Sequence, residues 1–372
     1  MAIPFIDLQA QRHAMGSALE TAMARVLERG DFIQGKEVRE FEAALAAFTR
    51  ASHVVSCANG TDALTLVAMA EGLGQGDVVF VPAFTFVATA EAFSILGMTP
   101  YFVDVDPHTF NMDVASLKIA IADAKSQGLK PRMVVPVDLF GQPADYDAIA
   151  PIVREERMVL VADAAQGLGG TLNGKHVGTL ADYTTTSFFP AKPLGCYGDG
   201  GAVLTNDADK AALIKSLTQH GKGTEKYDNV RVGLNSRLDT LQAAILIEKL
   251  KIYPGELAAR DRVAARYTDA LKACCETPTL LNGTTSSWAQ YTLKLPARDA
   301  VQTKLKMAGV PSAVYYPLPL HRQSGYSDCP VVPGGVSSAD ALAGQVLSLP
   351  MHAYLREQQQ DVIISFVRDA YA

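Results

Sequence analysis

The sequence predicts an α/β fold, with a mainly parallel central sheet in a large domain and a smaller α+β domain at the C-terminus. Short apolar runs alternate with helical patterns through the first two-thirds of the 372 residues, which indicates strand–helix–strand crossovers. Tyr253-Pro254-Gly255 interrupts the helical pattern, and the alternation is lost beyond it. We therefore expect a large domain of residues 1–253 and a small domain of residues 254–372.

The elements of the large domain are expected in alternation. Apolar runs predict strands at 78–81, 101–105, 133–137 and 158–162. Helical patterns between these runs predict helices at 85–96, 113–126 and 144–156. Because each helix would connect two neighbouring strands, this region should form the parallel part of the sheet.

The pattern changes after residue 182. Two strands at 183–188 and 201–205 flank a glycine-rich turn, and a helix follows near 207–219. A long amphipathic helix is expected over 236–250, where Ser236 and Asp239 have the spacing of a capping box. In the small domain we expect helices at 255–273, 299–308 and 355–370, and strands at 287–295 and 312–316.

Composition and charge exclude several classes of protein. The chain has 33 Lys and Arg against 39 Asp and Glu, a formal charge of −6, without a long basic run, so nucleic-acid binding is not expected. Its apolar runs are too short to span a membrane, and no membrane insertion is expected. The N-terminal residues do not resemble a secretory signal. The five cysteines lack CxxC spacing and fit reduced thiols better than disulfides or zinc ligands. We expect a cytoplasmic protein without a metal site.

A lysine and an aspartate at two strand ends are the strongest candidates for catalytic residues. Lys192 follows strand 183–188 in the segment Phe188-Phe189-Pro190-Ala191-Lys192-Pro193. Burial there would lower the pKa of its amine, as a Schiff-base lysine needs, although a surface lysine on a loop fits the same segment. Asp163 ends the run 158–162, at the sheet edge where α/β proteins bind ligands. It could pair with the ring nitrogen of a pyridine cofactor or cap a helix.

Two further strand ends carry weaker signals for the same ligand. Asn59-Gly60-Thr61 opens a helix, where free backbone N–H groups and the Thr61 hydroxyl suit a phosphate; an ordinary helix cap is the alternative. Phe86 follows strand 78–81 and could stack on a planar ring or pack in the core. The four strand ends together indicate one phosphorylated aromatic cofactor.

These segments, in this order, resemble those of the DegT/StrS family of nucleotide-sugar aminotransferases, which have the aspartate-aminotransferase fold (fold type I). The resemblance extends over essentially the whole chain and includes residues 30–35, Asp163-Ala164-Ala165-Gln166 and Gly233-Leu234-Asn235-Ser236-Arg237. It implies pyridoxal 5′-phosphate as the cofactor, with pyridoxamine phosphate as its intermediate form. It also implies a homodimer with shared active sites.

The resemblance implies a role for each site residue. Lys192 would bind the cofactor and then transfer protons, and no other lysine lies in a comparable setting. Asp163 would pair with the ring nitrogen, Gln166 would lie near the phenolic oxygen, and Phe86 would stack on the ring. The phosphate would be held by Gly60, Thr61, Ser187 and, from the neighbouring subunit, Asn235.

The segments 192–201, 231–242 and 288–292 resemble one branch of the family in particular. That branch aminates carbon 3 of UDP-linked 3-keto N-acetyl sugars, such as UDP-2-acetamido-2-deoxy-3-oxo-glucose or -glucuronate, in the synthesis of surface polysaccharide, lipopolysaccharide or other glycans. The implied amino donor is glutamate. Arg237 is a candidate for binding a carboxylate of glutamate or of the uronate, with a surface arginine as the alternative.

Further candidate substrate contacts lie near the C-terminus: Tyr315, Tyr316 and His321, for which ordinary loop packing is the alternative. In the 3-ketouronate enzymes we expect a histidine before the Tyr-Pro pair, where this chain has Tyr315-Tyr316-Pro317. The sequence therefore supports recognition of a uronate less strongly than it supports amination.

Other functions fit the sequence less well than this one. A 4-keto-6-deoxy nucleotide sugar is the alternative substrate, and a non-catalytic regulator that binds the cofactor is the alternative of a different class. A nicotinamide oxidoreductase is disfavoured because Gly72-Leu73-Gly74-Gln75-Gly76 follows a helix and precedes a strand, the reverse of the dinucleotide motif. A sugar dehydratase of the same family would have histidine in place of Lys192.

Overall fold

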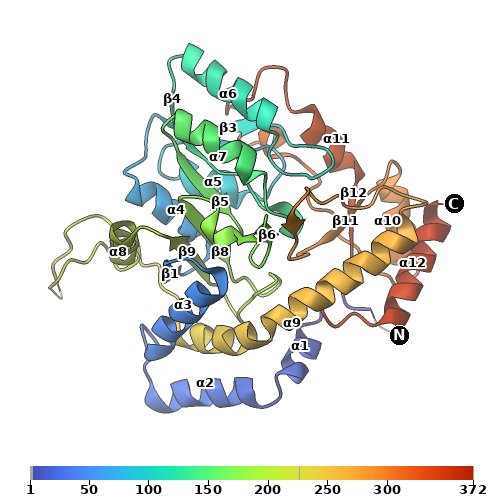
Figure 1. The fold of residues 1–372 in the computed structure, drawn as a ribbon, viewed down its shortest axis with the longest axis horizontal. Helices are drawn as coiled ribbons and strands as arrows, with labels where there is room; N and C mark the ends of the chain where they lie inside the picture. Colours follow the sequence, from blue (N-terminus) through green and yellow to red (C-terminus); the bar gives the residue numbers. More distant parts are fainter. Residues whose placement is uncertain (1–2, 226, 372) are drawn as a thin grey trace.

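The computed structural model describes residues 3–225 and 227–371 and has a seven-stranded sheet at its centre (Figure 1). The strands lie in the order β1-β9-β8-β5-β4-β2-β3, and all neighbouring pairs from β8 to β3 are parallel. Strand β9 runs antiparallel to both of its neighbours, β1 and β8. The predicted α/β class with a mainly parallel sheet is confirmed.

The strands of this sheet are β1 (His53–Cys57), β2 (Asp77–Pro82), β3 (Thr99–Val103), β4 (Lys130–Val134), β5 (Val159–Asp163), β8 (Tyr183–Ser187) and β9 (Gly201–Thr205). All but β1 were predicted from the sequence, with ends shifted by at most three residues. Residues on both faces of β2, β3 and β5 are buried. Such strands show continuous apolar runs rather than alternation, so the sequence pattern locates them but does not define their ends.

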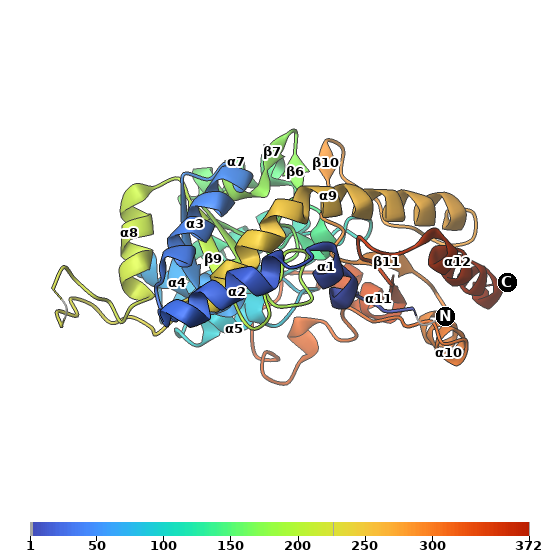
Figure 2. The same cartoon turned by 90° about the horizontal axis from the view of Figure 1, so that it is seen from below.

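Polar side chains cap most of the helices that follow the strands of this sheet. These helices are α4 (Gly60–Ala70), α5 (Ala88–Ser94), α6 (Val114–Ser126), α7 (Tyr146–Glu155) and α8 (Ala208–Leu217). Asp113, Asp145 and Asp207 each accept a backbone N–H of the first turn of α6, α7 and α8, which satisfies one donor that the helix itself cannot pair. Helices lie on both faces of the sheet (Figures 1 and 2).

Helix α9 (Thr240–Leu271) corrects two predictions. The expected break at Tyr253-Pro254-Gly255 is wrong, because the helix continues through Pro254 as one element of 32 residues. Tyr253 and Glu256 on either side of the proline are buried, so packing outweighs the roughly 3 kcal/mol cost of an internal proline. The capping box at Ser236 is also wrong: its hydroxyl instead accepts a hydrogen bond from the Ala58 N–H at 3.1 Å. The division into domains at residue 253 stays a prediction, and one continuous helix crosses it.

The C-terminal part of the chain forms a second hydrophobic core. Its elements are β11 (Tyr291–Lys294), α10 (Arg298–Met307), α11 (Ser337–Gln345), β12 (Val346–Leu349) and α12 (Glu357–Tyr371). The end of α9 contributes Val263, Tyr267 and Leu271 to this core, while α11 packs against the core of the central sheet. Strands β11 and β12 pair antiparallel.

Two strand predictions in this part need correction. The predicted strand 312–316 is wrong, because only Ala313 of this segment forms a β-bridge, with Ser348. The Tyr316 hydroxyl instead accepts a hydrogen bond from Gln166. The strand expected at 287–295 is shorter, because Trp288 has a φ of 49°, which lies outside the β region.

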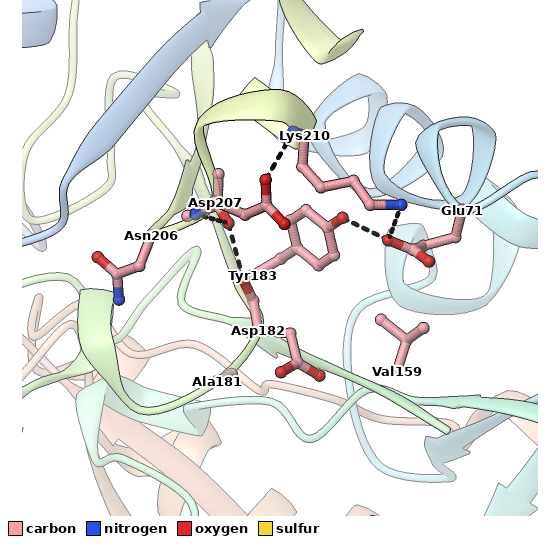
Figure 3. A pocket seen from close by; sticks show the side chains of 9 residues that line it. Glu71, Val159, Ala181, Asp182, Tyr183, Asn206, Asp207 and Lys210 are labelled. Atoms are coloured by element: carbon pink, nitrogen blue, oxygen red, sulfur yellow. Dashed lines mark hydrogen bonds and ion pairs between the residues drawn. The ribbon is translucent and has the colours of Figure 1, made fainter. Parts of the chain in front are cut away.

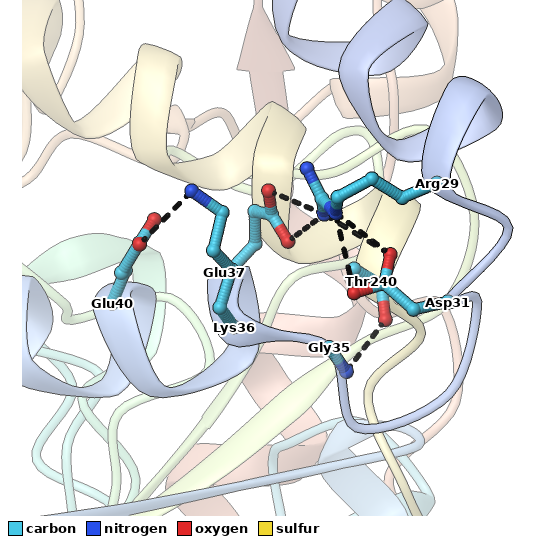
Figure 4. A network of polar contacts seen from close by, with 7 residues as sticks. All are labelled: Arg29, Asp31, Gly35, Lys36, Glu37, Glu40 and Thr240. Atoms are coloured by element: carbon cyan, nitrogen blue, oxygen red, sulfur yellow. Dashed lines mark hydrogen bonds and ion pairs between the residues drawn. The ribbon is translucent and has the colours of Figure 1, made fainter.

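Three N-terminal helices were not predicted: α1 (Leu8–Ala14), α2 (Ala18–Arg29) and α3 (Lys36–Thr49). The loop between α2 and α3 is fixed to the start of α9 (Figure 4). The Gly35 N–H donates to Thr240 Oγ1 at 3.0 Å, and the Thr240 N–H donates to the Phe32 carbonyl at 2.9 Å. Arg29 pairs with Glu37 at 2.7 Å. This loop is therefore a rigid part of the fold.

The remaining elements are short. Strands β6 (Thr171–Leu172), β7 (Lys175–His176) and β10 (Thr284–Thr285) form a three-stranded sheet, and single turns of 3₁₀ helix occur at Leu139–Gly141, Val177–Thr179 and Leu320–Arg322. Within residues 3–225 and 227–371, none of the helices combines the length and the apolar character needed to cross a membrane.

Candidate active site

Asp163 is the last residue of β5, at the carboxyl edge of the parallel strands, and only 5% of it is exposed. Thr89 Oγ1 on α5 donates to Asp163 Oδ2 at 2.8 Å, and the Ala165 N–H donates to Oδ1 at 3.2 Å. Burial raises the pKa of the carboxyl group, while Thr89, Ala165 and the charge of Lys192 act in the opposite direction. The carboxylate is thus held in a fixed orientation and is stabilised by a positive charge.

Lys192 lies half-buried in the turn that follows β8, where its N–H donates to the Phe189 carbonyl at 2.8 Å. Burial lowers the pKa of its amine, and the charge of Asp163 opposes that shift. A neutral amine is the form that attacks a carbonyl carbon. The structure therefore places the two residues near enough for their charges to interact, as their strand ends suggested.

The three residues of this chain that were predicted to hold the phosphate meet at the N-terminus of α4. Asn59 caps the helix by accepting the Asp62 N–H at 2.8 Å, so α4 begins at Gly60. A Cβ at Gly60 would lie 2.7 Å from the Cβ of Ser187, so only glycine allows this contact between α4 and β8. Thr61 follows on the first turn. Backbone N–H groups, the helix dipole and two hydroxyls converge here, an arrangement suited to a phosphate.

Gln166 and Phe86 both contact Tyr316. Gln166 Nε2 donates to the Tyr316 hydroxyl at 3.2 Å, and Gln166 Oε1 accepts the Phe140 N–H at 2.6 Å. The rings of Phe86 and Tyr316 have centroids 6.2 Å apart. Phe86 is 53% exposed, so it is available to stack on a planar ring rather than being part of the core.

Within the described part of the chain, the other predicted site residues form no hydrogen bond or ion pair with Asp163 or Lys192. Tyr315 packs between the rings of Phe5 and Tyr316. His321 Nε2 lies 3.3 Å from Asp340 of α11. Asn235 is exposed. Arg237 is half-buried, and its guanidinium forms no hydrogen bond or ion pair among the residues that the structure describes.

Sequence reasoning missed two residues around Asp163. Thr89 lay inside a predicted helix, and only its position one turn after Phe86 pointed to the site. Asp138 follows the predicted strand 133–137, a signal that could have been used. Its N–H donates to the Asp163 carbonyl at 3.0 Å, and its carboxylate accepts the Tyr146 hydroxyl at 2.7 Å. Burial raises the pKa of Asp138 to about 7. Asp138 thus supports the strand end that carries Asp163.

A hollow of about 640 Å³ lies at the edge of the sheet opposite to the one that carries Asp163 and Lys192 (Figure 3). Its charged groups are paired with protein atoms: Lys210 lies 2.9 Å from Glu71, and Asp182 accepts the Leu160 N–H at 2.9 Å. Asp207 caps α8. Size alone does not make this hollow a functional site, and we assign it no role.

The residues at the carboxyl edge fit pyridoxal phosphate. Gly60 lies against Ser187 at the start of α4, where the first N–H groups of the helix and the hydroxyls of Thr61 and Ser187 could bind a phosphate. Lys192 supplies an amine, Asp163 a carboxylate for a ring nitrogen, and Phe86 an exposed ring for stacking. This donor set on a seven-stranded α/β sheet defines the class of fold type I pyridoxal-phosphate-dependent enzymes.

Comparison with known proteins supports the same class of enzyme. The chain belongs to the DegT/DnrJ/EryC1/StrS aminotransferase family, whose model matches residues 14–368. It is therefore a pyridoxal-phosphate-dependent transaminase, as the sequence predicted. The sugar dehydratase and oxidoreductase alternatives receive no support from this match.

Three curated relatives span nearly the whole chain. A UDP-2-acetamido-2-deoxy-3-oxo-D-glucuronate aminotransferase of Pseudomonas aeruginosa is 46% identical, over 95% of this chain and 96% of the relative. A pleiotropic regulatory protein of Geobacillus stearothermophilus is 39% identical, over 100% and 99%. A UDP-N-acetyl-3-dehydro-α-D-glucosamine 3-aminotransferase of Acidithiobacillus ferrooxidans is 38% identical, over 99% and 97%.

Solved structures show the same fold. A DegT/DnrJ/EryC1/StrS aminotransferase from Brucella abortus has a TM-score of 0.98 and 48% identity, covering 100% of both chains. NtdA from Bacillus subtilis, solved with bound cofactor PMP, has a TM-score of 0.89 and 29% identity, covering 100% of this chain and 85% of the other. The predicted fold type I architecture is confirmed.

Proposed function

We propose that this transaminase transfers an amino group from glutamate to carbon 3 of a UDP-linked 3-keto N-acetyl sugar, in the synthesis of a surface polysaccharide or another glycan. The observation that carries the proposal is the interaction of Lys192 and Asp163 at one sheet edge. The names of the two relatives that act on 3-oxo and 3-dehydro UDP sugars support the substrate. The candidates are UDP-2-acetamido-2-deoxy-3-oxo-glucose and its glucuronate counterpart.

Lys192 and Asp163 divide the work of catalysis. Pyridoxal phosphate, when bound, would supply an electron sink for the negative charge that develops as the α-carbon loses its proton. The Asp163 carboxyl group, held by Thr89, would in its charged form keep a proton on the ring nitrogen and so strengthen that sink. The Lys192 amine would hold the cofactor. It would also remove the proton from the α-carbon of glutamate in the first half-reaction and deliver a proton to carbon 3 of the sugar in the second.

The remaining contacts fix the position of the cofactor. Gly60, Thr61 and Ser187 would hold the phosphate at the start of α4, and Gln166 would lie near the phenolic oxygen. Phe86 would stack on the ring. Tyr315 and Tyr316 stay proposed sugar contacts. His321 stays one as well, although a substrate would compete with its pairing to Asp340.

A homodimer would complete the site, with Asn235 of the partner subunit reaching the phosphate. Large apolar side chains exposed on the single chain support a second copy as their cover: Phe32 (45%), Ile33 (49%), Phe189 (51%), Val230 (52%) and Val232 (87%). Phe32 and Ile33 lie in the loop between α2 and α3, which hydrogen bonds to Thr240 hold in place, so their backbone loses little entropy when they are covered.

A substrate panel tests the proposed function. Purified protein with pyridoxal phosphate is given glutamate and UDP-, dTDP- or GDP-linked keto sugars, and the amino sugar and 2-oxoglutarate are measured. We expect kcat/KM for UDP 3-keto N-acetyl sugars to exceed that for dTDP 4-keto-6-deoxy sugars by roughly 10²-fold or more, the discrimination available to a site that pairs polar substrate groups.

Two outcomes would contradict this proposal. A preference for the 4-keto-6-deoxy sugar would assign the alternative substrate. A visible absorption band that glutamate leaves unchanged would indicate a regulator that binds the cofactor without turning it over. That second outcome has some support, since one relative is named a regulatory protein.

Changing Arg237 to lysine is expected to raise the Michaelis constant of the carboxylate-bearing partner by about 10-fold, because an ammonium group cannot replace two parallel guanidinium hydrogen bonds. Steady-state kinetics with glutamate and with the uronate and non-uronate sugars show which carboxylate it binds. Arg231→Lys, an exposed arginine six residues earlier, is the control. If no Michaelis constant responds to the change at Arg237, the proposed clamp is wrong.

A further inference from the structure

The loop that carries Lys192 is held from behind by helix α9. Gln242 accepts the Tyr197 N–H at 2.8 Å through its Oε1, and its Nε2 donates to the Tyr197 carbonyl at 3.4 Å. Two turns further along the same helix, Lys249 Nζ donates to the Gly195 carbonyl at 2.6 Å. Helix α9 thus hydrogen bonds to the loop through two side chains, at positions three and five residues beyond Lys192.

Lys249 is an unusual residue for a protein core. Its exposure is 0%, and in the part of the chain that the structure describes its amine forms no ion pair with a carboxylate. The amine lies 4.3 Å from the centre of the Tyr197 ring, a contact that partly replaces hydration of the cation. Lys249 is thus a second buried lysine, but its setting differs from that of Lys192: its hydrogen bond and its ring contact are both with the loop, and the charge of Glu256 acts on it as well.

The contact at Gly195 is transmitted directly to the turn of Lys192. A Cβ at Gly195 would lie 2.6 Å from the carbonyl oxygens of Phe189 and Pro190. The Phe189 carbonyl is also the acceptor of the Lys192 N–H. Gly195 therefore packs against the backbone that forms the turn, and fixing its carbonyl fixes the turn.

The next residue, Cys196, holds the loop against Phe188, the residue that follows strand β8. The Cys196 N–H donates to the Phe188 carbonyl at 2.8 Å, so the loop closes on itself immediately after Gly195. Between this closure and α9, the backbone of the loop has few ways to move.

We propose that Lys249, together with Gln242, is a positioning residue that holds the loop so that the Lys192 amine stays opposite Asp163. Lys249 touches neither Asp163 nor Lys192 in this arrangement; it acts through the Gly195 carbonyl and the Tyr197 ring. The inference deepens the proposed function and rests on it, since it assumes that Lys192 is the residue that binds the cofactor and transfers the proton.

Lys249→Met tests the proposal because it removes the donor and the cation while keeping a side chain of similar length. Lys251→Met is the matched control: Lys251 lies on the same helix but is exposed and pairs with Glu248. Gln242→Leu is a second variant, which loosens the same loop from a half-buried position and keeps the test decisive if Lys249→Met does not fold.

The first measurement is amide hydrogen exchange of residues 194–200 in the cofactor-free protein. We expect exchange to become about 10-fold faster or more in Lys249→Met and Gln242→Leu, since a buried carbonyl or N–H loses its partner. In Lys251→Met it should stay within about 2-fold of the unchanged chain. Unchanged exchange in a folded loop variant, or equal changes in both lysine variants, would overturn the proposal.

The second measurement is the pH titration of the visible absorption band of the cofactor-loaded protein, with kcat and KM measured beside it. We expect the midpoint to move and kcat to fall in the loop variants, while KM for glutamate changes by less than about 2-fold. A lower Tm with an unmoved midpoint would mean a purely structural role. If the unchanged chain shows no band, the proposed function fails, and hydrogen exchange still decides whether α9 holds the loop.

Discussion

Replacing Lys192 with alanine is expected to lower turnover by about 10⁴-fold, because the variant lacks both the amine that holds the cofactor and the base that transfers the proton. The half-buried setting that lowers the pKa of the Lys192 amine is what makes it suitable for both tasks. The measurements are the rate of 2-oxoglutarate formation and the visible absorption band of a cofactor–lysine adduct, which the variant should not develop. The fold should be retained, because no hydrogen bond of the Lys192 side chain is lost among the described residues.

The control for this experiment is Lys251→Ala, which removes an exposed lysine. A Lys192→Ala variant with substantial turnover and a normal band would move the adduct to another lysine, and Lys249 would be the first to examine because it is the other buried lysine near the loop.

Replacing Asp163 with asparagine is expected to reduce kcat by roughly 10²–10³-fold, the usual effect of removing one electrostatic contact to a developing charge. Asparagine keeps the shape: its carboxamide oxygen can still accept from the Ala165 N–H, and its NH2 group can donate to Thr89 Oγ1, which then becomes the acceptor. It loses the charge that keeps the ring nitrogen protonated. Single-turnover rates with glutamate isolate this step from sugar binding.

The same substitution should change the pH dependence of the rate. Burial raises the pKa of Asp163, so the charged, active form is lost at a higher pH than for an ordinary aspartate, and activity falls as the pH decreases through that pKa. Asparagine does not titrate and should abolish this acidic limb. A near-normal rate with Tm and cofactor affinity unchanged would show that Asp163 is not the partner of the ring nitrogen.

Local patterns were sufficient for the main residues of the site. Asp163 and Gly60 were found because each follows an apolar strand, and parallel strands bring their carboxyl ends to one edge. Lys192 was found because lysine is rare in an apolar, proline-flanked segment. The four segments together resembled one family, which the comparisons confirm.

Other features depended on contacts between segments distant in the sequence. Pro254 predicts a break in isolation, but the buried residues on both sides of it keep α9 continuous. The pattern of residues 312–316 predicts a strand, but Tyr316 instead forms a hydrogen bond with Gln166, which lies 150 positions earlier in the chain. Ser236 looked like a helix cap and instead bonds to Ala58.

The sequence by itself determined the alternation of strands and helices in the parallel part of the sheet, the residue types at the strand ends and the family, because these depend on residue type and short-range periodicity. The tertiary structure alone decided which side chains support the reactive pair: Thr89 on Asp163, Asp138 behind it, and Lys249 beneath the Lys192 turn. No local pattern encodes such contacts, since each joins residues at least 25 positions apart that meet only when the sheet and α9 have packed.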